Sequence, residues 1–325
     1  MNPIENIRRP VAADFSMFEQ RFAQTLQSHV STLNDIFTHL KNHRGKHIRP
    51  ILTLLSAKLC GNINEKTIDT SIVLELLHTA SLLHDDVIDN ADTRHSQPSV
   101  NKKWSNKLAI LSGDYLLATA MSCLTQMRNT RIQQLICDLS HTLSEGEVLE
   151  INYGSDIWIT EQQYFEIIKK KTASLFATCT EAGAISVGAT AYQANNLHAF
   201  GDELGTCFQL QDDIFDYSEN EQLGKPTMND IRDKKVTLPL LVALQRAPQQ
   251  ESEQLKQRIE NDVFDWELEN DIKSFVMRYD GIRYTRKKIE EHKRQARLAL
   301  TVFHPVTPAY EALLQLLDFT TQRTF

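Results

Sequence analysis

An apolar run that ends in a group of acids is the feature that most constrains how this chain folds. Residues 74–83 are apolar with helical spacing, and Asp85, Asp86 and Asp89 follow at once. Asp85 and Asp89 are four positions apart, so on a helix their carboxylates lie one turn apart and repel each other. Because the preceding run is expected to be buried, these acids are not expected to face open water, and a cation must offset their charge.

The same acidic pattern, Asp-Asp-x-x-Asp, returns at Asp212, Asp213 and Asp216, again on an apolar helical run. A single copy is a weak signal, since it is more often a solvated helix end. Two copies, each followed by Lys or Arg, predict carboxylates that face one another across a bundle and bind divalent metal. Ligands that are all oxygen favour a hard cation, and Mg²⁺ typically shares its coordination sphere with substrate phosphates.

Bases follow both acidic motifs closely, at Arg94, Lys225 and Lys235. They suit a pyrophosphate held between metal and cations, and the apolar helices beside them suggest a substrate with a charged head and an apolar tail. Binding the pyrophosphate in this way makes it a better leaving group. Ionisation of an allylic C–O bond then gives a carbocation, which the protein stabilises and shields from water. A Gly-x-x-x-x-Gly-Lys-[Ser/Thr] phosphate loop is absent from the sequence.

Composition excludes several other classes of protein. Of 325 residues, 41% are hydrophobic and 24% charged, as is ordinary for a globular protein. The net charge of −7 argues against general nucleic-acid binding. The five scattered cysteines predict buried, reduced thiols and a cytoplasmic protein. The N-terminus lacks a signal sequence, and no apolar run approaches the roughly 20 residues of a membrane span, so no transmembrane segment is expected.

Scarce glycine and proline, 11 and 9 residues, permit long helices nearly everywhere, and no stretch alternates like a strand. We predict one all-α domain over residues 1–325. Apolar spacing predicts a first helix over residues 13–41. Three glutamates further along are expected on a solvated helix face: Glu145, Glu147 and Glu150.

Isolated polar residues near the apolar helices allow two interpretations each. Lys46 and Arg49 are three apart and can point the same way, although alone they are more often a solvated helix start. His78 lies on the side of its helix that leads to the acids, and both a core and a functional role stay open. Lys171 and Thr172 lie among small apolar residues, where a buried lysine needs an anion.

Taken together, these motifs resemble the trans-isoprenyl (polyprenyl) diphosphate synthases, most of all the long-chain members. The matching pieces are Gly45-Lys46-x-x-Arg49-Pro50, His84-Asp85-Asp86-x-x-Asp89, Gly113-Asp114, Lys171-Thr172, Gln209-x-x-Asp212-Asp213-x-x-Asp216, Gly224-Lys225-Pro226 and Lys235-x-Thr237-Leu-Pro239. The resemblance implies an antiparallel helical bundle around a central cavity, of the isoprenoid synthase type, and a homodimer. It also implies Mg²⁺-dependent head-to-tail condensation, with three Mg²⁺ ions when substrate is bound. An allylic diphosphate, farnesyl or geranyl diphosphate, ionises; isopentenyl diphosphate attacks; and the released diphosphate removes a proton before the next cycle.

The resemblance assigns an expected role to each matching residue. The metal ligands are Asp85, Asp89 and Asp212, supported by Asp86, Asp213 and Asp216. The allylic diphosphate contacts Arg94, Lys171, Thr172, Gln209, Lys225 and Lys235. The isopentenyl diphosphate contacts Lys46, Arg49, His78 and His95.

Four positions depart from the family's usual pattern. His95 replaces the second of two arginines, and because histidine is only partly charged near neutral pH, we expect weaker or more pH-sensitive binding of isopentenyl diphosphate. His47 replaces a common Arg, while Arg44 and Met228 each replace a Gly. All six motif aspartates are retained, so an active enzyme is expected.

The residues before Asp85 bear on product length. Ala80 and Ser81 lie one helical turn deeper, about 5.4 Å, where a bulky aromatic residue forms the floor in short-chain relatives. Neither side chain blocks a growing tail, and Leu77, one turn further, is only a partial stop. We therefore expect a medium to long product. The alternative is that these small residues only let two helices pack closely.

Three other functions are weighed against this one. A class I terpene cyclase also uses an Asp-rich motif with Mg²⁺, but it has no need of Lys46 and Arg49 for a second diphosphate. A non-catalytic or regulatory subunit of a heteromeric prenyl synthase tends to lose its aspartates, which this chain keeps. A metal phosphohydrolase built on His84-Asp85 needs further His ligands, and His78 is six positions away on a poor common face.

Overall fold

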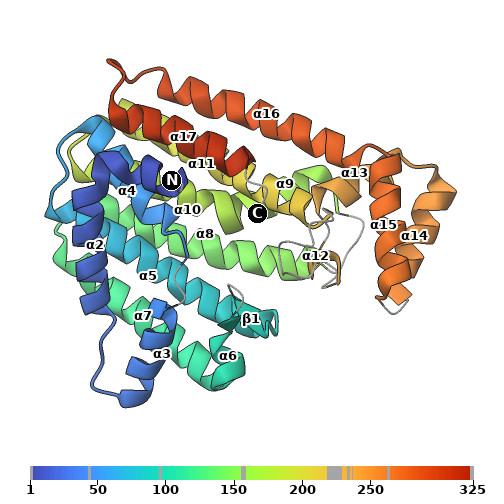
Figure 1. The fold of residues 1–325 in the computed structure, drawn as a ribbon, viewed down its shortest axis with the longest axis horizontal. Coiled ribbons are helices and arrows are strands. Elements are labelled where there is room, and N and C mark those ends of the chain that lie inside the picture. Colours follow the sequence, from blue (N-terminus) through green and yellow to red (C-terminus); the bar gives the residue numbers. More distant parts are fainter. Residues whose placement is uncertain are drawn as a thin grey trace. The chain divides into compact units, whose positions relative to one another are not determined.

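The computed structural model describes residues 3–42, 45–94, 97–154, 159–217, 229–232, 235, 237–261 and 264–322. Over these ranges every regular element is a helix except two short strands, β1 (Thr93–Arg94) and β2 (Gln97–Pro98), which pair antiparallel (Figure 1). The predicted all-α fold is confirmed. Contacts within the chain group it into two compact units, and each is described by itself. The single domain over residues 1–325 stays a prediction.

Unit 1 comprises residues 1–140, 175–201 and 299–316. Besides β1 and β2, its elements are α1 (Pro3–Arg8), the 3₁₀ helix η1 (Arg9–Val11), α2 (Ala12–Thr25), α3 (Ser31–Asn42), α4 (Ile48–Cys60), α5 (Glu65–Ile88), α6 (Val100–Lys103), α7 (Asn106–Gln126) and nearly all of α10 (Ser174–Ser186). Besides α10, whose first residue belongs to unit 2, four helices have residues in both units: α8 (Thr130–Gly154), α11 (Ala191–Phe215), α16 (Gly281–Leu300) and α17 (Pro308–Gln322).

Helix α5 is the central helix of unit 1. It begins at a capping box, in which the Asn64 side chain accepts a hydrogen bond from the Thr67 amide at 3.3 Å. From Thr67 to Leu77 almost every side chain is buried, because α2, α4 and α7 pack around it (Figure 1). A helix that is covered on nearly all sides needs no continuous polar face, and the Asp-Asp-x-x-Asp motif lies at its carboxyl end.

The predicted first helix over residues 13–41 is wrong, because the structure breaks it into α2 and α3. Leu26 leaves the helical region, with φ −88° and ψ 59°. The side chain of Asn34 then holds the connection, accepting a hydrogen bond from the Ser28 amide at 2.9 Å and donating to its carbonyl. These contacts satisfy backbone groups that a continuous helix satisfies by itself.

Helix α7 bears on the expectation that the chain has no transmembrane segment. Among the described residues it alone is long and apolar enough, by length and composition, to cross a membrane, and 33% of its most apolar window is buried. One face of α7, including Ser112, Gly113 and Leu116, is buried and packs along α5. A core helix of a globular protein passes the same test of length and composition.

The cysteines are all free, as expected, but not all buried. Cys179 and Cys207 are buried, whereas Cys60 and Cys123 are partly exposed and Cys137 is exposed on α8. The prediction of buried thiols is therefore wrong for Cys137, which lies on the outer face of an amphipathic helix.

Unit 2 comprises residues 141–174, 202–298 and 317–325. Its own elements are α9 (Glu161–Ile168), the π-helix η2 (Lys169–Ala173), α12 (Asn229–Arg232), α13 (Leu238–Arg246), α14 (Gln249–Asn261) and α15 (Trp266–Arg278). A buried cluster centred on Leu240, Ile272 and Val276 joins α13 and α15, and Tyr217 packs into it. This core holds the start of α13 beside the end of α11.

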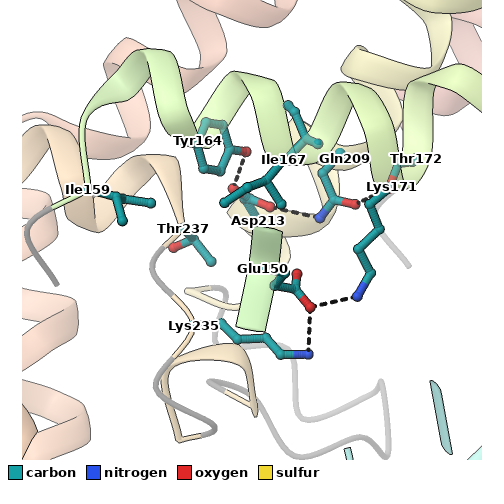
Figure 2. Close-up of a pocket in the computed structure, with 11 residues that line it drawn as sticks. Glu150, Ile159, Tyr164, Ile167, Lys171, Thr172, Gln209, Asp213, Lys235 and Thr237 are labelled. Atoms are coloured by element: carbon teal, nitrogen blue, oxygen red, sulfur yellow. Dashed lines mark hydrogen bonds and ion pairs between the residues drawn. The ribbon is translucent and has the colours of Figure 1, made fainter. Parts of the chain in front are cut away.

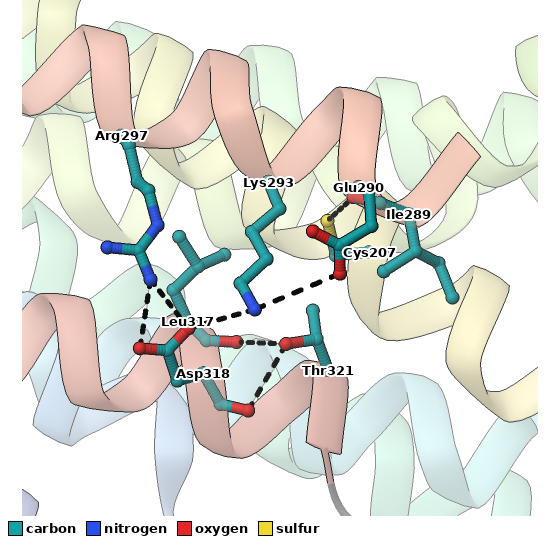
Figure 3. Close-up of polar contacts among 8 residues, drawn as sticks. All are labelled: Cys207, Ile289, Glu290, Lys293, Arg297, Leu317, Asp318 and Thr321. Carbon is teal, nitrogen blue, oxygen red and sulfur yellow. Dashed lines mark hydrogen bonds and ion pairs between the residues drawn. The ribbon is translucent and has the colours of Figure 1, made fainter. Parts of the chain in front are cut away.

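A polar cluster joins α16 to the end of α17 within unit 2 (Figure 3). Asp318 accepts hydrogen bonds from Lys293 at 3.0 Å and from Arg297 at 2.7 Å. Although partial burial raises the pKa of Asp318, the hydrogen bonds and charges of Lys293 and Arg297 outweigh it and hold this pKa below its usual value. The folded state thus favours the ionised carboxylate.

Candidate active site

The first acidic motif lies at the carboxyl end of α5, in unit 1. Asp85 and Asp89 are partly exposed, one helical turn apart, and the Asp89 amide donates to the Asp85 carbonyl at 2.8 Å. Asp86 is instead 2% exposed, and its carboxylate accepts a hydrogen bond from Arg94 Nε at 2.6 Å. Asn101 also donates to the Asp86 carbonyl at 3.1 Å. The outer acids of the motif therefore reach solvent, while the middle acid anchors the turn that follows.

Gly113, which precedes Asp114 on α7, leaves room for His84, the residue before the first acidic motif. A Cβ at Gly113 would lie 2.3 Å from His84 Nε2, so only glycine allows the ring to lie against α7. There, His84 Nε2 lies 3.3 Å from the Ile110 carbonyl and 3.5 Å from Asp114. These contacts orient the end of α5 and explain why a glycine precedes the acid on α7.

The residues expected to bind isopentenyl diphosphate lie at the start of α4 and on α5. Lys46 is exposed just before α4, Arg49 is partly buried in its first turn, and His78 is partly buried on α5. The Arg49 guanidinium lies over the Phe176 ring, 5.2 Å from its centre. Helices α4 and α5 pack together, so all three side chains belong to one part of unit 1.

The proposed chain-length residues differ in their surroundings. Leu77 and Ala80 are 7% and 0% exposed, whereas Ser81 is partly exposed. The Ser81 hydroxyl donates to the His78 carbonyl at 2.9 Å, one turn back along α5. Because the Ser81 hydroxyl is hydrogen-bonded within its own helix, this small side chain needs no further polar partner.

The second acidic motif ends α11, in unit 2. Asp212 and Asp216 are partly exposed, while Asp213 is 1% exposed. One Asp213 oxygen, Oδ2, accepts hydrogen bonds from the Tyr164 hydroxyl at 2.6 Å and from the Leu238 amide at 3.0 Å. The other oxygen, Oδ1, accepts from Gln209 Nε2 at 3.0 Å. The middle acid is again the anchored one, and it ties α11 to α9 and α13.

A pocket of about 230 Å³ in unit 2 brings several predicted residues together (Figure 2). Lys171, Thr172, Gln209 and Lys235 all line it, with Asp213 beside them. The Thr172 hydroxyl donates to Gln209 Oε1 at 3.0 Å, which links η2 to α11. Other lining residues are Glu150, Ile159, Tyr164, Ile167, Ile168 and Thr237. The pocket thus combines cations, hydroxyls and apolar side chains.

Two glutamates in this pocket region were assigned wrongly from sequence. Glu147 and Glu150 are not on a solvated face, because Lys171 Nζ donates to them at 2.9 Å and 2.6 Å. Lys235 Nζ lies 3.4 Å from the same Glu150 oxygen. Glu145, in contrast, is 62% exposed as predicted, although it pairs with Lys170. A signal was present: Glu147 and Glu150 are three apart and share one face of a helix.

The local backbone explains why Lys171 reaches these glutamates. Lys171 lies in the π-helix η2, a wider turn of a kind frequent at functional sites. Opposite it, a Cβ at Gly146 would lie 2.8 Å from the Lys171 amide nitrogen, so glycine allows α8 to approach closely. Burial lowers the pKa of Lys171, but the charges of Glu150 and Glu147 outweigh it and raise this pKa above its usual value. Lys171 is therefore firmly cationic.

Comparisons with known proteins identify the family. The sequence model described as "Polyprenyl synthetase" matches residues 30–276. The chain is 32% identical over 321 residues to the octaprenyl diphosphate synthase of Escherichia coli (strain K12), across 98% of this chain and 99% of that relative.

The chain belongs to the polyprenyl synthetase family.

Solved structures agree with this assignment. A polyprenyl synthase from Caulobacter crescentus CB15, complexed with calcium and isoprenyl diphosphate, has a TM-score of 0.93 and 31% identity, with 98% of each chain covered. A decaprenyl diphosphate synthase from Rhodobacter capsulatus has a TM-score of 0.94 and 31% identity, with 99% of each chain covered. The resemblance to polyprenyl diphosphate synthases, the isoprenoid synthase fold and the expectation of a prenyltransferase enzyme are confirmed.

The roles that the resemblance assigns to the site residues stay predictions. His95, Lys225, Arg44 and Met228 lie outside the described residues. The first acidic motif belongs to unit 1 and the second to unit 2, so each is placed only within its own unit.

The metal prediction rests on the chemistry of the donors. In the part of the chain that the structure describes, no three His, Cys, Asp or Glu side chains gather closely enough to hold a metal by themselves. Mg²⁺ differs from Zn²⁺ in this respect, because it keeps several waters and is usually bound through one or two carboxylates plus substrate phosphates. The partly exposed oxygens of Asp85, Asp89 and Asp212 fit such an ion and fit poorly a metal that prefers sulfur or nitrogen ligands.

Proposed function

We propose that this chain is a Mg²⁺-dependent polyprenyl diphosphate synthase that condenses an allylic diphosphate with isopentenyl diphosphate head-to-tail. The product is a medium- to long-chain all-trans polyprenyl diphosphate. The observation that carries the proposal is the unit 2 pocket, where Lys171, Thr172, Gln209 and Lys235 meet beside Asp213. Such a set of cations and hydroxyls suits a diphosphate far better than a neutral ligand.

The two acidic motifs divide into acids that bind metal and acids that hold the backbone. Asp85, Asp89 and Asp212 would hold Mg²⁺, because they combine partial exposure with a position at a helix end. When bound, Mg²⁺ neutralises the charge that develops on a departing diphosphate. Asp86 and Asp213 are buried and hydrogen-bonded, so they support the metal ligands. Asp216 completes the second motif in a supporting role.

The allylic diphosphate is proposed to bind at Lys171, Thr172, Gln209 and Lys235, with Arg94 and Lys225 completing the set. Donors held in place before the reaction stabilise the negative charge that develops as the allylic C–O bond breaks. The buried hydrogen bonds of Asp213 fix Gln209 and the start of α13, so these donors are preorganised. The released diphosphate then accepts the proton lost from the new cation.

The isopentenyl diphosphate is proposed to bind at Lys46, Arg49 and His78, with His95 completing the set. The cationic side chains of Lys46 and Arg49 at the start of α4 suit its diphosphate. Ala80 and Ser81 are proposed to leave room for the growing tail, and Leu77 to be its partial stop. The small partly exposed side chain of Ser81 supports this.

The chain is further proposed to form a homodimer in the cytoplasm. Helix α7 exposes Ile110, Leu111 and Met121, which are 42%, 59% and 67% exposed. Large apolar side chains exposed together on one helix are typical of an interface between subunits. The free cysteines agree with a reducing compartment. We propose a single catalytic domain over residues 1–325.

Product analysis tests the proposal. Purified protein is incubated with Mg²⁺, labelled isopentenyl diphosphate and farnesyl diphosphate, and the dephosphorylated products are sized by chromatography. We expect a ladder that ends in a long chain. Asp89→Asn should abolish the ladder, whereas the matched control Asp92→Asn should retain it, because Asp92 lies beyond the motif and pairs with Lys102 on the surface. Unreacted farnesyl diphosphate indicates a non-catalytic subunit, and a cyclised hydrocarbon indicates a cyclase; either result contradicts the proposal.

A further inference from the structure

A buried histidine–glutamate pair lies directly between the two cations at the start of α4. His47 follows Lys46 and precedes Arg49 by two positions. Its Nδ1 lies 2.8 Å from Glu75 Oε1 on α5, and the two side chains are 9% and 10% exposed. Ionisable groups are seldom buried to this degree unless they are paired, so this contact holds the turn against α5.

Three aromatic rings of α2 enclose the imidazole. The rings of Phe15, Phe18 and Phe22 have their centres 6.2, 5.9 and 6.2 Å from that of His47. All three contacts are edge-to-face, an arrangement that fixes the orientation of each ring. The imidazole therefore has one orientation, with Nδ1 toward Glu75.

The backbone of His47 is held in an uncommon conformation by these contacts. Its φ is 48° and its ψ is 43°, in the left-handed region, and its carbonyl accepts the first hydrogen bond of α4 from the Ile51 amide. Few residues other than glycine adopt this conformation, although histidine and asparagine do so more often than most, and the contacts of the imidazole support it here. The direction in which Lys46 and Arg49 leave the backbone thus depends on the side chain between them.

We propose that His47 is a positioning residue, which holds Lys46 and Arg49 in place for isopentenyl diphosphate through its buried contact with Glu75, and does so best when the imidazole is protonated. This inference rests on the proposed binding of isopentenyl diphosphate by Lys46 and Arg49. Protonation converts the contact into an ion pair, which is stronger than a hydrogen bond between neutral groups, especially when buried. Histidine changes charge near neutral pH, so substrate affinity becomes pH-dependent.

Apart from His78, the groups described below that face this pair do not change charge in the same range. The α2 side chains around the ring are phenylalanines, with Arg8 stacked over Phe15 at 5.0 Å. Arg49 is permanently charged. On α10, burial raises the pKa of Cys179 to about 12, so the thiol beside Arg49 and Glu75 stays neutral. His78 lies one turn beyond Glu75 on α5, and it is present in every variant compared below.

The second nitrogen and the second oxygen of the pair make no hydrogen bond within the described part of the chain. His47 Nε2 and Glu75 Oε2 are both buried, and neither has a hydrogen-bond partner among the residues that the structure describes. Only the contact between Nδ1 and Oε1 therefore links the two side chains. Substituting either His47 or Glu75 therefore removes this contact, while the side chains of Lys46 and Arg49 stay unchanged.

The test is calorimetric titration of isopentenyl diphosphate into the full-length protein from about pH 6 to about pH 8. We expect the wild-type affinity to weaken over this range by about three- to tenfold more than that of His47→Arg, which keeps its charge throughout. Glu75→Gln should bind weakly and with the same small pH dependence as His47→Arg. Farnesyl diphosphate affinity, measured in parallel, should be alike in all of them.

One further variant separates the side-chain contact from the backbone conformation. Asparagine tolerates the left-handed region, so His47→Asn keeps the turn but loses the ion pair, and it should bind isopentenyl diphosphate weakly at every pH. Circular dichroism checks that each variant is folded. Equal pH profiles for wild type and His47→Arg overturn the inference and leave the proposed function intact. A wild-type chain that binds no isopentenyl diphosphate at any pH overturns both.

Discussion

Replacing Asp213 tests how the pocket of unit 2 is held together. Its carboxylate is 1% exposed and accepts three hydrogen bonds, from Tyr164, Leu238 and Gln209. Asp213→Ala leaves all three donors without this acceptor. A buried donor that loses its partner costs about 1–3 kcal/mol, and the losses at one site do not add fully. We therefore expect Asp213→Ala to lower the free energy of unfolding by about 3–5 kcal/mol.

Two milder variants calibrate this expectation. In Asp213→Asn, the amide oxygen still accepts from Tyr164 and Leu238, and Gln209 is able to turn over so that its oxygen meets the new amide. Thr172 then accepts from the Gln209 nitrogen. We expect a loss of about 1–2 kcal/mol for Asp213→Asn, and a similar loss for Tyr164→Phe, which removes one hydrogen bond.

The assay combines urea unfolding, followed by circular dichroism, with hydrogen exchange of the segment that contains Leu238. Asp213→Ala should show the largest loss of stability and faster exchange at the start of α13, because the Leu238 amide loses its acceptor. Tyr164→Phe should leave that exchange nearly unchanged. If Asp213→Ala is as stable as Tyr164→Phe, or exchanges no faster at Leu238, the anchoring role of Asp213 is refuted.

Four other substitutions give distinct outcomes. Ser81→Phe should shorten the main product seen by chromatography, whereas Ala80→Phe should mainly destabilise the fold because Ala80 is 0% exposed. An unchanged product from a folded Ser81→Phe variant contradicts the proposal that Ser81 leaves room for the growing tail. Glu150→Gln should tighten inorganic pyrophosphate binding several-fold in calorimetry, because a carboxylate no longer competes for Lys171; equal or weaker binding contradicts this. The lowered pKa of Asp318 stabilises the fold above the unfolded value of about 3.9, and this is lost as pH falls through the folded value. The melting temperature of Asp318→Asn should therefore fall less on acidification than that of the wild type. Parallel plots of melting temperature against pH for the two proteins would disprove the linkage.

The sequence was sufficient where the chemistry lies in local patterns. Apolar runs with few glycines and prolines predicted the all-α fold, and the motifs predicted several residues that the structure brings together. Lys171, Thr172, Gln209 and Lys235 are far apart in the chain, yet they line one pocket. The order and spacing of the motifs, rather than any single residue, identified the family.

The sequence was insufficient where a side chain's role depends on a neighbour from another segment. Glu147 and Glu150 resemble a solvated helix face until the π-turn of η2 brings Lys171 beside them. The break before α3 depends on Asn34 reaching back to Ser28. The partner of His47 is likewise 28 positions away. Helical spacing contains no information about these tertiary contacts.

The buried middle acid of each motif illustrates the same limit. Asp86 and Asp213 have the same place in the pattern, and the resemblance gave both a supporting role. The structure supplies the physical basis for that proposal: Arg94 binds Asp86, while Tyr164 and the Leu238 amide bind Asp213. A repeated pattern predicts equivalent chemistry, but the partners that enforce it differ between the two units.

The most direct test of the account is the stoichiometry of a single reaction mixture. Isopentenyl diphosphate, farnesyl diphosphate and Mg²⁺ are incubated with the protein, and the isopentenyl units incorporated and the inorganic pyrophosphate released are counted together. Head-to-tail condensation predicts one pyrophosphate released for every isopentenyl unit incorporated, at all times before substrate runs out. Pyrophosphate release without incorporation, or neither release nor incorporation, would contradict the proposed condensation.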